Sequence, residues 1–177
     1  PYMLAVVLHH QNVLAQLVGD LQRLAGQTAE LLALAKQHGF AHWQATATLL
    51  QGWAVASDGA LDVGLAAMRR GLEAKKATGS RLKIPYYLGL MAGLLGGAGR
   101  SQEGLDLLDE SLCRVETTGE RWFEAELHRI RGDLLLELRP DRAAASYATA
   151  LQMAQRQQAG WWERRAARSL ATPIRAA

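Results

Sequence analysis

Apolar residues recur along this chain at helical spacing. Two segments show it clearly, with four apolar positions each: Leu61, Leu65, Met68 and Leu72, then Leu105, Leu108, Leu112 and Val115. Spacings of three and four place such side chains on one face of an α-helix. No segment alternates apolar and polar residues in the way that is typical of a half-buried strand. The pattern predicts an all-α protein.

Glycine recurs about every forty residues, at Gly39, Gly79, Gly119 and Gly160. Each follows a helix-compatible stretch and precedes an aromatic or apolar cluster, which is typical of a helix C-cap because glycine adopts positive φ without a Cβ clash. A second set of chain breakers lies midway between them: Gly19-Asp20, Asp58-Gly59, Gly99-Arg100 and Arg139-Pro140. Two turns in about forty residues predict one helix pair, repeated four times.

The expected helices follow from these breakers. The first helices of the pairs are expected at 2–18, 41–57, 84–98 and 121–138, the second helices at 21–38, 61–78, 101–118 and 142–159, and a final helix at 161–171. Pro85 suits a first helical turn, and Thr172-Pro173 should end the last helix. One pair cannot bury its apolar stripe alone. The pairs (2–38, 41–78, 84–118, 121–159) should therefore stack into one right-handed α-solenoid domain over residues 1–177, with about nine helices.

Small residues recur inside these helices at intervals of twelve and then seven. They are Gly52, Gly64 and Gly71, then Ala92, Gly104 and Ser111, then Gly132 with Ala144 or Ala145; Asn12 stands at the first such position. Glycine within a helix costs about 0.5 to 1 kcal/mol relative to alanine, so its recurrence indicates close crossing of the paired helices. The array resembles the tetratricopeptide repeat, although the unit has about forty rather than thirty-four residues and capping glycines replace the consensus proline.

Three segments, 119–136, 143–158 and 162–171, resemble the C-terminal helical repeats of large bacterial signalling ATPases. In those proteins the repeats follow a nucleotide-binding module, and often an N-terminal class III adenylate cyclase or winged-helix transcription-activator domain. The resemblance implies a regulatory or partner-sensing segment. No ATPase or cyclase residue lies in this chain to be carried over.

Composition limits the classes of protein to which the chain can belong. The chain is 49% hydrophobic with a net charge of +3, and no stretch reaches the roughly 18 apolar residues of a membrane span. It begins Pro-Tyr-Met without a visible signal peptide, which suggests a fragment of a longer cytoplasmic protein. The single cysteine, Cys113, excludes an intramolecular disulfide and is expected to be a small core residue.

Charge alternates in sign along the chain. The net charge is −1 over residues 1–60, +5 over 61–100, −5 over 101–140 and +4 over 141–177. This distribution favours pairing between neighbouring units and does not describe a uniformly basic nucleic-acid face. A basic aromatic end stands apart: Trp161 and Trp162 with Arg156, Arg164, Arg165 and Arg168. We expect tryptophans capping the core among solvated arginines, with nucleic-acid contact as the alternative.

Candidate catalytic and metal-binding residues are few. The histidines are His9, His10, His38, His42 and His128, and Gly39 separates His38 from His42 at a helix break, so the two do not share a face. His9 is expected to be exposed or to line a groove. The carboxylates Glu124, Glu126, Asp133 and Glu137 lack a paired nucleophile and are expected to be solvated. We expect no metal, no cofactor and no catalysis in this segment.

A partner-binding groove is the favoured functional hypothesis. In stacked pairs the first helices line the concave surface, so residues forty apart form rows. The expected rows are Val6, Thr46, Tyr86 and Glu126; His9, Leu49, Gly89 and Arg129; Val13, Trp53, Gly93 and Asp133. They describe a groove that is apolar at one end, glycine-floored in the middle and charged at the other, which suits a peptide or another domain of the same polypeptide. The open alternatives are that Trp53 and Leu49 belong to the core, or that the segment senses an effector or contacts nucleic acid.

Overall fold

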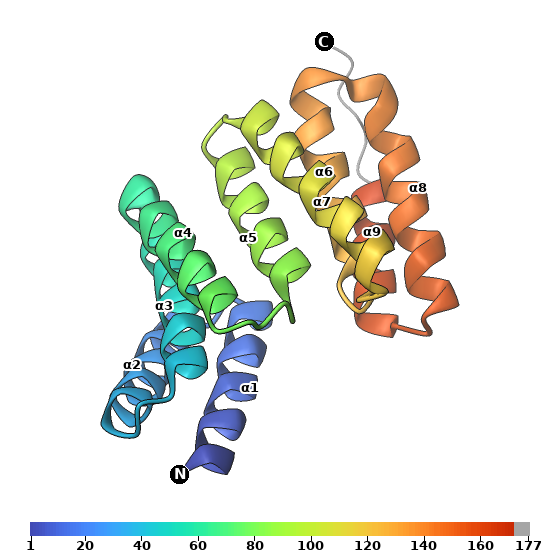
Figure 1. The fold of residues 1–177 in the computed structure, drawn as a ribbon. Helices are drawn as coiled ribbons and strands as arrows, with labels where there is room; N and C mark the ends of the chain where they lie inside the picture. The colour runs from blue at the N-terminus through green and yellow to red at the C-terminus, as the bar shows by residue number, and fades with distance from the viewer. Residues whose placement is uncertain (172–177) are drawn as a thin grey trace. The chain divides into compact units, whose positions relative to one another are not determined.

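The computed structural model describes residues 1–171, except for the side chain of Glu137, and this range contains nine α-helices and no strand (Figure 1). The helices are α1 (Tyr2–Val18), α2 (Leu21–Gln37), α3 (Ala41–Ser57), α4 (Leu61–Ala77), α5 (Ile84–Gly97), α6 (Ser101–Thr118), α7 (Glu124–Leu138), α8 (Pro140–Arg156) and α9 (Gly160–Ala171). The expected all-α class is confirmed. We call the odd-numbered helices A helices and the even-numbered helices B helices.

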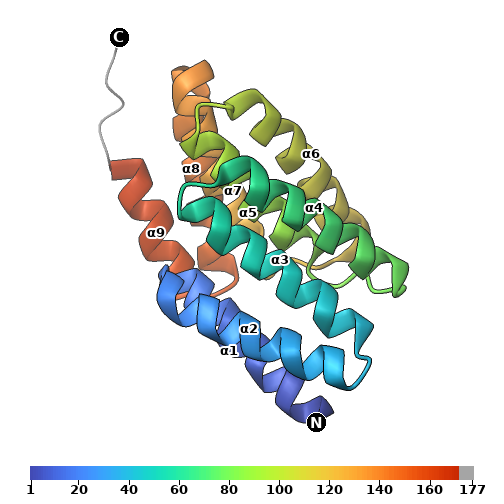
Figure 2. The same ribbon diagram turned by 90° about the vertical axis from the view of Figure 1, so that its left-hand side faces the viewer.

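The chain divides into two compact units, Pro1–Leu82 with α1 to α4, and a second unit from Lys83 onward with α5 to α9. In the first unit α1 pairs with α2, α3 pairs with α4, and α3 also packs against both helices of the first pair (Figure 2). In the second unit α7 packs against α5 and α6, pairs with α8, and is followed by α9, which contacts α7 and α8. Successive helix pairs therefore stack within each unit. Continuity of one domain across both units stays a prediction.

Glycines end most of the helices as expected. Six of them have positive φ: Gly19, Gly39, Gly59, Gly79, Gly99 and Gly119. The prediction for Gly160 is wrong, because this residue begins α9. Helix α8 ends earlier, at Arg156, and the left-handed residue that follows it is Gln158, with a φ of 53°.

Two helix starts differ from the expected positions by more than one residue. The predicted first turn of α7 is a separate turn, in which the Glu124 amide donates to the Arg121 carbonyl at 3.1 Å. Helix α8 begins at Pro140, two residues before the expected start, because proline fits the first turn of a helix. The predicted stop at Thr172-Pro173 lies outside the described residues.

The glycines of α3 and α4 bring the two backbones into contact. A Cβ built on Gly52 would lie 2.8 Å from the Gly64 carbonyl oxygen, and a Cβ on Gly64 would overlap the Gly52 carbonyl. A Cβ on Gly71 would lie 3.0 Å from the Leu49 amide nitrogen. The predicted close crossing is therefore confirmed in this pair.

In the second unit the crossings use both small and larger groups, and a Cβ on Gly104 of α6 would lie 3.0 Å from the Ala92 carbonyl oxygen of α5. The Ser111 hydroxyl donates to the Pro85 carbonyl at 2.9 Å and so joins α6 to α5. Gly132 of α7 faces the ring of Tyr147, where the sequence predicted Ala144 or Ala145. Of these two alanines, the first is half-buried and the second exposed, because the face of α8 that meets α7 lies one residue away.

Cys113 and His9 are placed differently from the sequence interpretation, and Asn12 lies where α1 meets α2. Cys113 is exposed, because it lies between the buried positions Ser111 and Val115 on the outer side of α6. His9 is buried, with its ring centroid 5.4 Å from that of Trp43. Asn12 is also buried, and its side-chain amide lies 3.5 Å from a carbonyl of α2.

Candidate functional site

The twelve predicted groove residues fall into two groups, one buried and one at the surface. Seven lie in the helix–helix core: His9, Val13, Thr46, Leu49, Tyr86, Gly89 and Glu126. Five reach the surface at least in part: Val6, Trp53, Gly93, Arg129 and Asp133. Helices α3 and α7 each pack against their own B helix and against the preceding pair, so each retains only a narrow solvent-facing strip. The alternative assignment holds for Leu49, which is core, whereas Trp53 is half-buried.

Three of the surface residues meet at one pocket in the second unit. The pocket has a volume of about 350 Å³ and lies between α5 and α7. Its lining consists of Gly93, Gly96 and Gly97 from α5 and Arg129, Ile130, Asp133 and Leu134 from α7. The glycine-floored middle and the charged end of the predicted groove are therefore adjacent at this point. We call these residues the α5–α7 pocket.

The glycines of α5 have two different roles. Gly89 and Gly96 make room for α7, because a Cβ on them would meet Leu127 and Leu134 respectively. A Cβ on Gly93 would meet nothing within 4 Å, and the same holds for Gly97. The first two glycines are thus explained by packing within the unit, whereas the last two leave open backbone at the pocket.

Arg129 and Asp133 of the pocket wall belong to a network of polar and charged side chains. The Arg129 guanidinium donates from Nε to Glu126 at 3.0 Å and from Nη1 to Asp133 at 2.6 Å. Arg165 of α9 donates to the same Glu126 carboxylate at 2.8 Å. Tyr147 of α8 donates its hydroxyl proton to Asp133 at 2.9 Å. Two arginines and two carboxylates balance, so the network has no formal net charge.

The network favours the protonated forms of Arg129 and Tyr147. Burial acts to lower the pKa of Arg129, but hydrogen bonds and charge from Glu126 and Asp133 outweigh it, so the pKa is raised. Burial, followed by the charge and hydrogen bond of Asp133, raises the pKa of Tyr147. Both groups stay protonated at neutral pH. They act as fixed hydrogen-bond donors.

This arrangement favours binding. A guanidinium has five N–H groups, and the contacts to Glu126 and Asp133 leave some of them for a ligand. Apolar side chains of α7 and bare glycine backbone of α5 form the rest of the lining. The pocket can therefore take a carboxylate or a backbone carbonyl beside a small apolar group. Its own carboxylates already accept hydrogen bonds from arginine and tyrosine, so they are not arranged as an acid–base pair.

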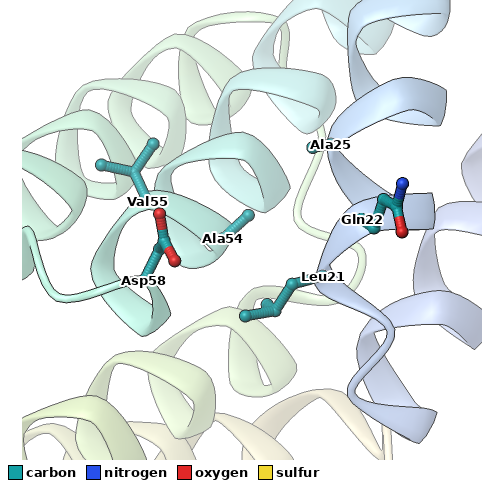
Figure 3. Close-up of a pocket in the computed structure, with 6 residues that line it drawn as sticks. All are labelled: Leu21, Gln22, Ala25, Ala54, Val55 and Asp58. Carbon is teal, nitrogen blue, oxygen red and sulfur yellow. The ribbon is translucent and has the colours of Figure 1, made fainter.

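Two further pockets lie within single units. The first, of about 420 Å³, lies between α2 and α3 and is lined by Leu21, Gln22, Ala25, Ala54, Val55 and Asp58 (Figure 3). It is mostly apolar and lies where small alanines face each other. The second, of about 320 Å³, lies among α6, α7 and α8 and carries Arg131, Arg139 and Arg142, with Arg131 paired to Asp109 at 3.0 Å.

The basic aromatic end is only partly as expected. Trp162 is buried and its ring meets that of Phe123 edge-on at 5.4 Å, whereas Trp161 remains exposed. Arg165 is not a solvated arginine, because it pairs with the buried Glu126. Sequence reasoning missed Arg165 and Tyr147 as members of the network. The spacing of 39 residues between Glu126 and Arg165, close to the repeat length, is the signal that could have found the first.

Within the described residues no group of three or more histidine, cysteine, aspartate or glutamate side chains is arranged to hold a metal ion. No helix in that part of the chain combines the length and apolar character that crossing a membrane requires.

No family model matches the chain. The chain is similar to an uncharacterized protein of Rhizobium meliloti (strain 1021), with 33% identity over 153 residues. The match covers 85% of this chain but 15% of that protein, so the chain spans only a small part of its relative's length. Sequence of this kind therefore occurs inside a much longer polypeptide. The relative's name describes no activity.

Proposed function

We propose that this segment is a non-catalytic protein-interaction module, which binds a peptide or a partner domain on its A-helix surface within a bacterial signalling protein. The α5–α7 pocket is the proposed anchoring point. The resemblance to tetratricopeptide repeats and to the helical repeats of signalling ATPases supports the same role. Both resemblances are part of the proposal. The placement of the segment in a regulatory protein is part of it as well.

The observation that carries the proposal is the open backbone at Gly93 and Gly97. Each glycine within a helix costs about 0.5 to 1 kcal/mol relative to alanine. At Gly52, Gly64, Gly89 and Gly96 a close helix contact explains that cost, but a Cβ on Gly93 or Gly97 meets nothing. Gly26 of α2 is open in the same way, so it is their place at the α5–α7 pocket that distinguishes Gly93 and Gly97. A ligand that approaches the α5 backbone closely would explain the cost at these two positions.

The chemistry of the pocket favours one class of ligand. A helix or an extended segment with a small apolar side chain fits over the glycines, and its carboxylate or carbonyl oxygen can accept from the remaining N–H groups of Arg129. Because the network is formally neutral, long-range attraction of a highly charged ligand contributes little. Shape and short-range hydrogen bonding would therefore set the specificity.

Filling the pocket tests the proposal. Peptides would be selected from a random phage-displayed library on the wild-type protein, and their affinity measured by fluorescence anisotropy. Gly93→Leu places a side chain over the floor, with a Cβ that meets nothing within 4 Å, so we expect the selected peptides to lose about tenfold or more in affinity. The matched control is Gly26→Leu, at a helical glycine of α2 that is also exposed and without neighbours within 4 Å.

Arg129→Leu gives a second arm, because it removes the fixed donor and leaves the floor open. Peptides that bind the wild type, Gly93→Leu and Arg129→Leu equally would contradict the proposal. So would the absence of any enriched peptide. The alternative role in nucleic-acid contact remains a prediction about Arg164 and Arg165, and a DNA affinity that falls steeply with salt and is lost with these two residues would favour it.

A further inference from the structure

Helix α1 exposes an apolar stripe along its whole length. Met3, Val7 and Leu14 expose 70%, 48% and 62% of their surface, and Val18 continues the same line. With His10 between them, the spacings are four, three, four and four, which places all five on one face of the helix. Single exposed apolar residues are ordinary on a protein surface. A continuous stripe marks a surface that another element covers.

The same positions are buried in the next A helix. Forty residues after the stripe, Trp43, Ala47 and Ala54 of α3 expose 7%, 0% and 9%. Trp43 and Ala47 share one core cluster with residues of the preceding pair: Ala5, Leu8, Leu31 and Ala35. Ala54 faces α2 across the pocket shown in Figure 3. This face of α3 is thus the one that receives the preceding helix pair.

Helix α7 repeats the arrangement in the second unit. Phe123, Leu127 and Leu134 occupy the positions that correspond to Met3, Val7 and Leu14, and they are buried. The first two cover Gly89 of α5, while Leu134 reaches α5 and α6. In both units, therefore, these positions pack against the helix pair that comes before in the sequence.

The stripe also has the chemistry of a dry helix contact. Helix α1 contains no aspartate, glutamate, lysine or arginine, in contrast to the B helices, each of which carries charged residues. No fixed charge would have to be desolvated when another helix covers it. The absence of basic groups also gives a phosphate-bearing ligand nothing to bind.

We propose that this face of α1 is an inter-pair docking surface, and that its occupant is a further helix pair of the same repeat type carried by the same polypeptide ahead of Pro1. Covalently preceding pairs cover the corresponding faces of α3 and α7. The length of the Rhizobium relative, of which this chain matches 15%, shows that such sequence is carried in longer polypeptides. The proposal is independent of ligand binding at the α5–α7 pocket.

A single-thiol probe tests it. In a Cys113→Ser background, which removes the exposed native thiol, Leu14→Cys places a reporter at the centre of the stripe. Its reaction rate with a maleimide would be measured in residues 1–177 and in the product of the complete reading frame. We expect labelling about tenfold or more slower in the complete product, because opening of the covered interface then limits the reaction.

Val63→Cys is the matched control, since Val63 is an equally exposed apolar residue on α4. It should react at the same rate in both proteins. Equal rates at position 14 in both proteins would overturn the proposal. A slow rate at position 14 within residues 1–177, which rises on dilution, would overturn it as well, because a second copy would then be the occupant.

Discussion

The helix pairs α3–α4 and α7–α8 carry a glycine at the same place in the repeat, Gly52 and Gly132, but use it differently. In α3–α4 the space admits the backbone of Gly64, so the two helices touch through their main chains. In α7–α8 it admits the ring of Tyr147, whose hydroxyl continues to Asp133. The same small residue thus permits either a close backbone crossing or a buried tyrosine that donates a hydrogen bond to a surface carboxylate.

The comparison extends to the neighbouring positions. Thr46 and Leu49 of α3 correspond to Glu126 and Arg129 of α7. The threonine satisfies its hydroxyl within its own helix, donating to the His42 carbonyl at 2.8 Å, and Leu49 is fully buried against Gly71. Their counterparts instead belong to a network that joins α7 to α9 through ion pairs and to α8 through the Tyr147 hydroxyl. The repeat therefore fixes where helices pack, while individual residues decide whether a position serves the core or a site.

The largest effect should come from Gly64→Ala. Its Cβ would overlap backbone atoms of α3, which cannot move without separating the helices, so we expect unfolding to become easier by about 3 kcal/mol. At Gly132 the obstacle is the Tyr147 side chain, and Gly132→Ala combined with Tyr147→Ala should cost less than the sum of the two single changes. Urea unfolding of each variant measures this. Additive costs would show that the two crossings do not differ.

The ion-pair network should give the next largest effect. Glu126 is buried between two arginines, so Glu126→Gln leaves their charges poorly compensated and should lower the free energy of unfolding by about 2 to 3 kcal/mol. Glu103→Gln breaks an exposed pair with Arg100 and should cost about 0.5 kcal/mol or less. Chemical denaturation compares the two. Equal costs would mean that burial does not strengthen the network.

A filled cavity should stabilise the first unit. Ala54 lines the pocket between α2 and α3, whereas the corresponding Leu134 fills the space between α7 and the helices before it. Ala54→Leu should therefore raise the free energy of unfolding by about 0.5 to 1.5 kcal/mol. Thermal and urea unfolding measure it, with Ala41→Leu at an exposed position of the same helix as the control. A loss of stability would show that the pocket cannot accept the side chain.

The smallest effect concerns pH. Burial lowers the pKa of His128, and the Arg131 charge adds to this, while Glu124 and Glu116 oppose it. The folded protein binds this proton less readily than the unfolded chain does. The contribution of neutral His128 to the free energy of unfolding is therefore complete above the pKa of the unfolded state, and it is lost as the pH falls below that pKa. His128→Gln should reduce the drop in urea midpoint between pH 8 and pH 5. If the drop is unchanged in this variant, groups other than His128 cause the loss of stability at low pH.

Much of the architecture could be predicted from residues alone. The helix bounds of α1, α3 and α6 match the prediction, and positive φ occurs at Gly39, Gly79 and Gly119 as expected. These features are local, because a cap or a breaker acts on its own turn. The burial of His9 and Glu126 could not be predicted in this way. Each depends on a helix that arrives from elsewhere in the chain.

The candidate site, too, could be predicted only in part from the sequence. Gly93, Arg129 and Asp133 were predicted as members of rows, and the structure places them around one pocket. The rows gave no account of Arg165 or Tyr147, since nothing in their local sequence distinguishes a network partner from a solvated side chain. Cys113 was assigned to the core although it is exposed, because a small residue fits either face of a helix.

By itself, the sequence determined the helices, their turns, the period of about forty residues and the glycines at the crossings, because propensity, capping and apolar spacing act over a few residues. Only the tertiary structure decided which face of each A helix is buried, that Gly132 receives Tyr147, and that two arginines share Glu126. Those outcomes depend on the distance between elements that are remote in the chain, and packing of whole helix pairs sets that distance.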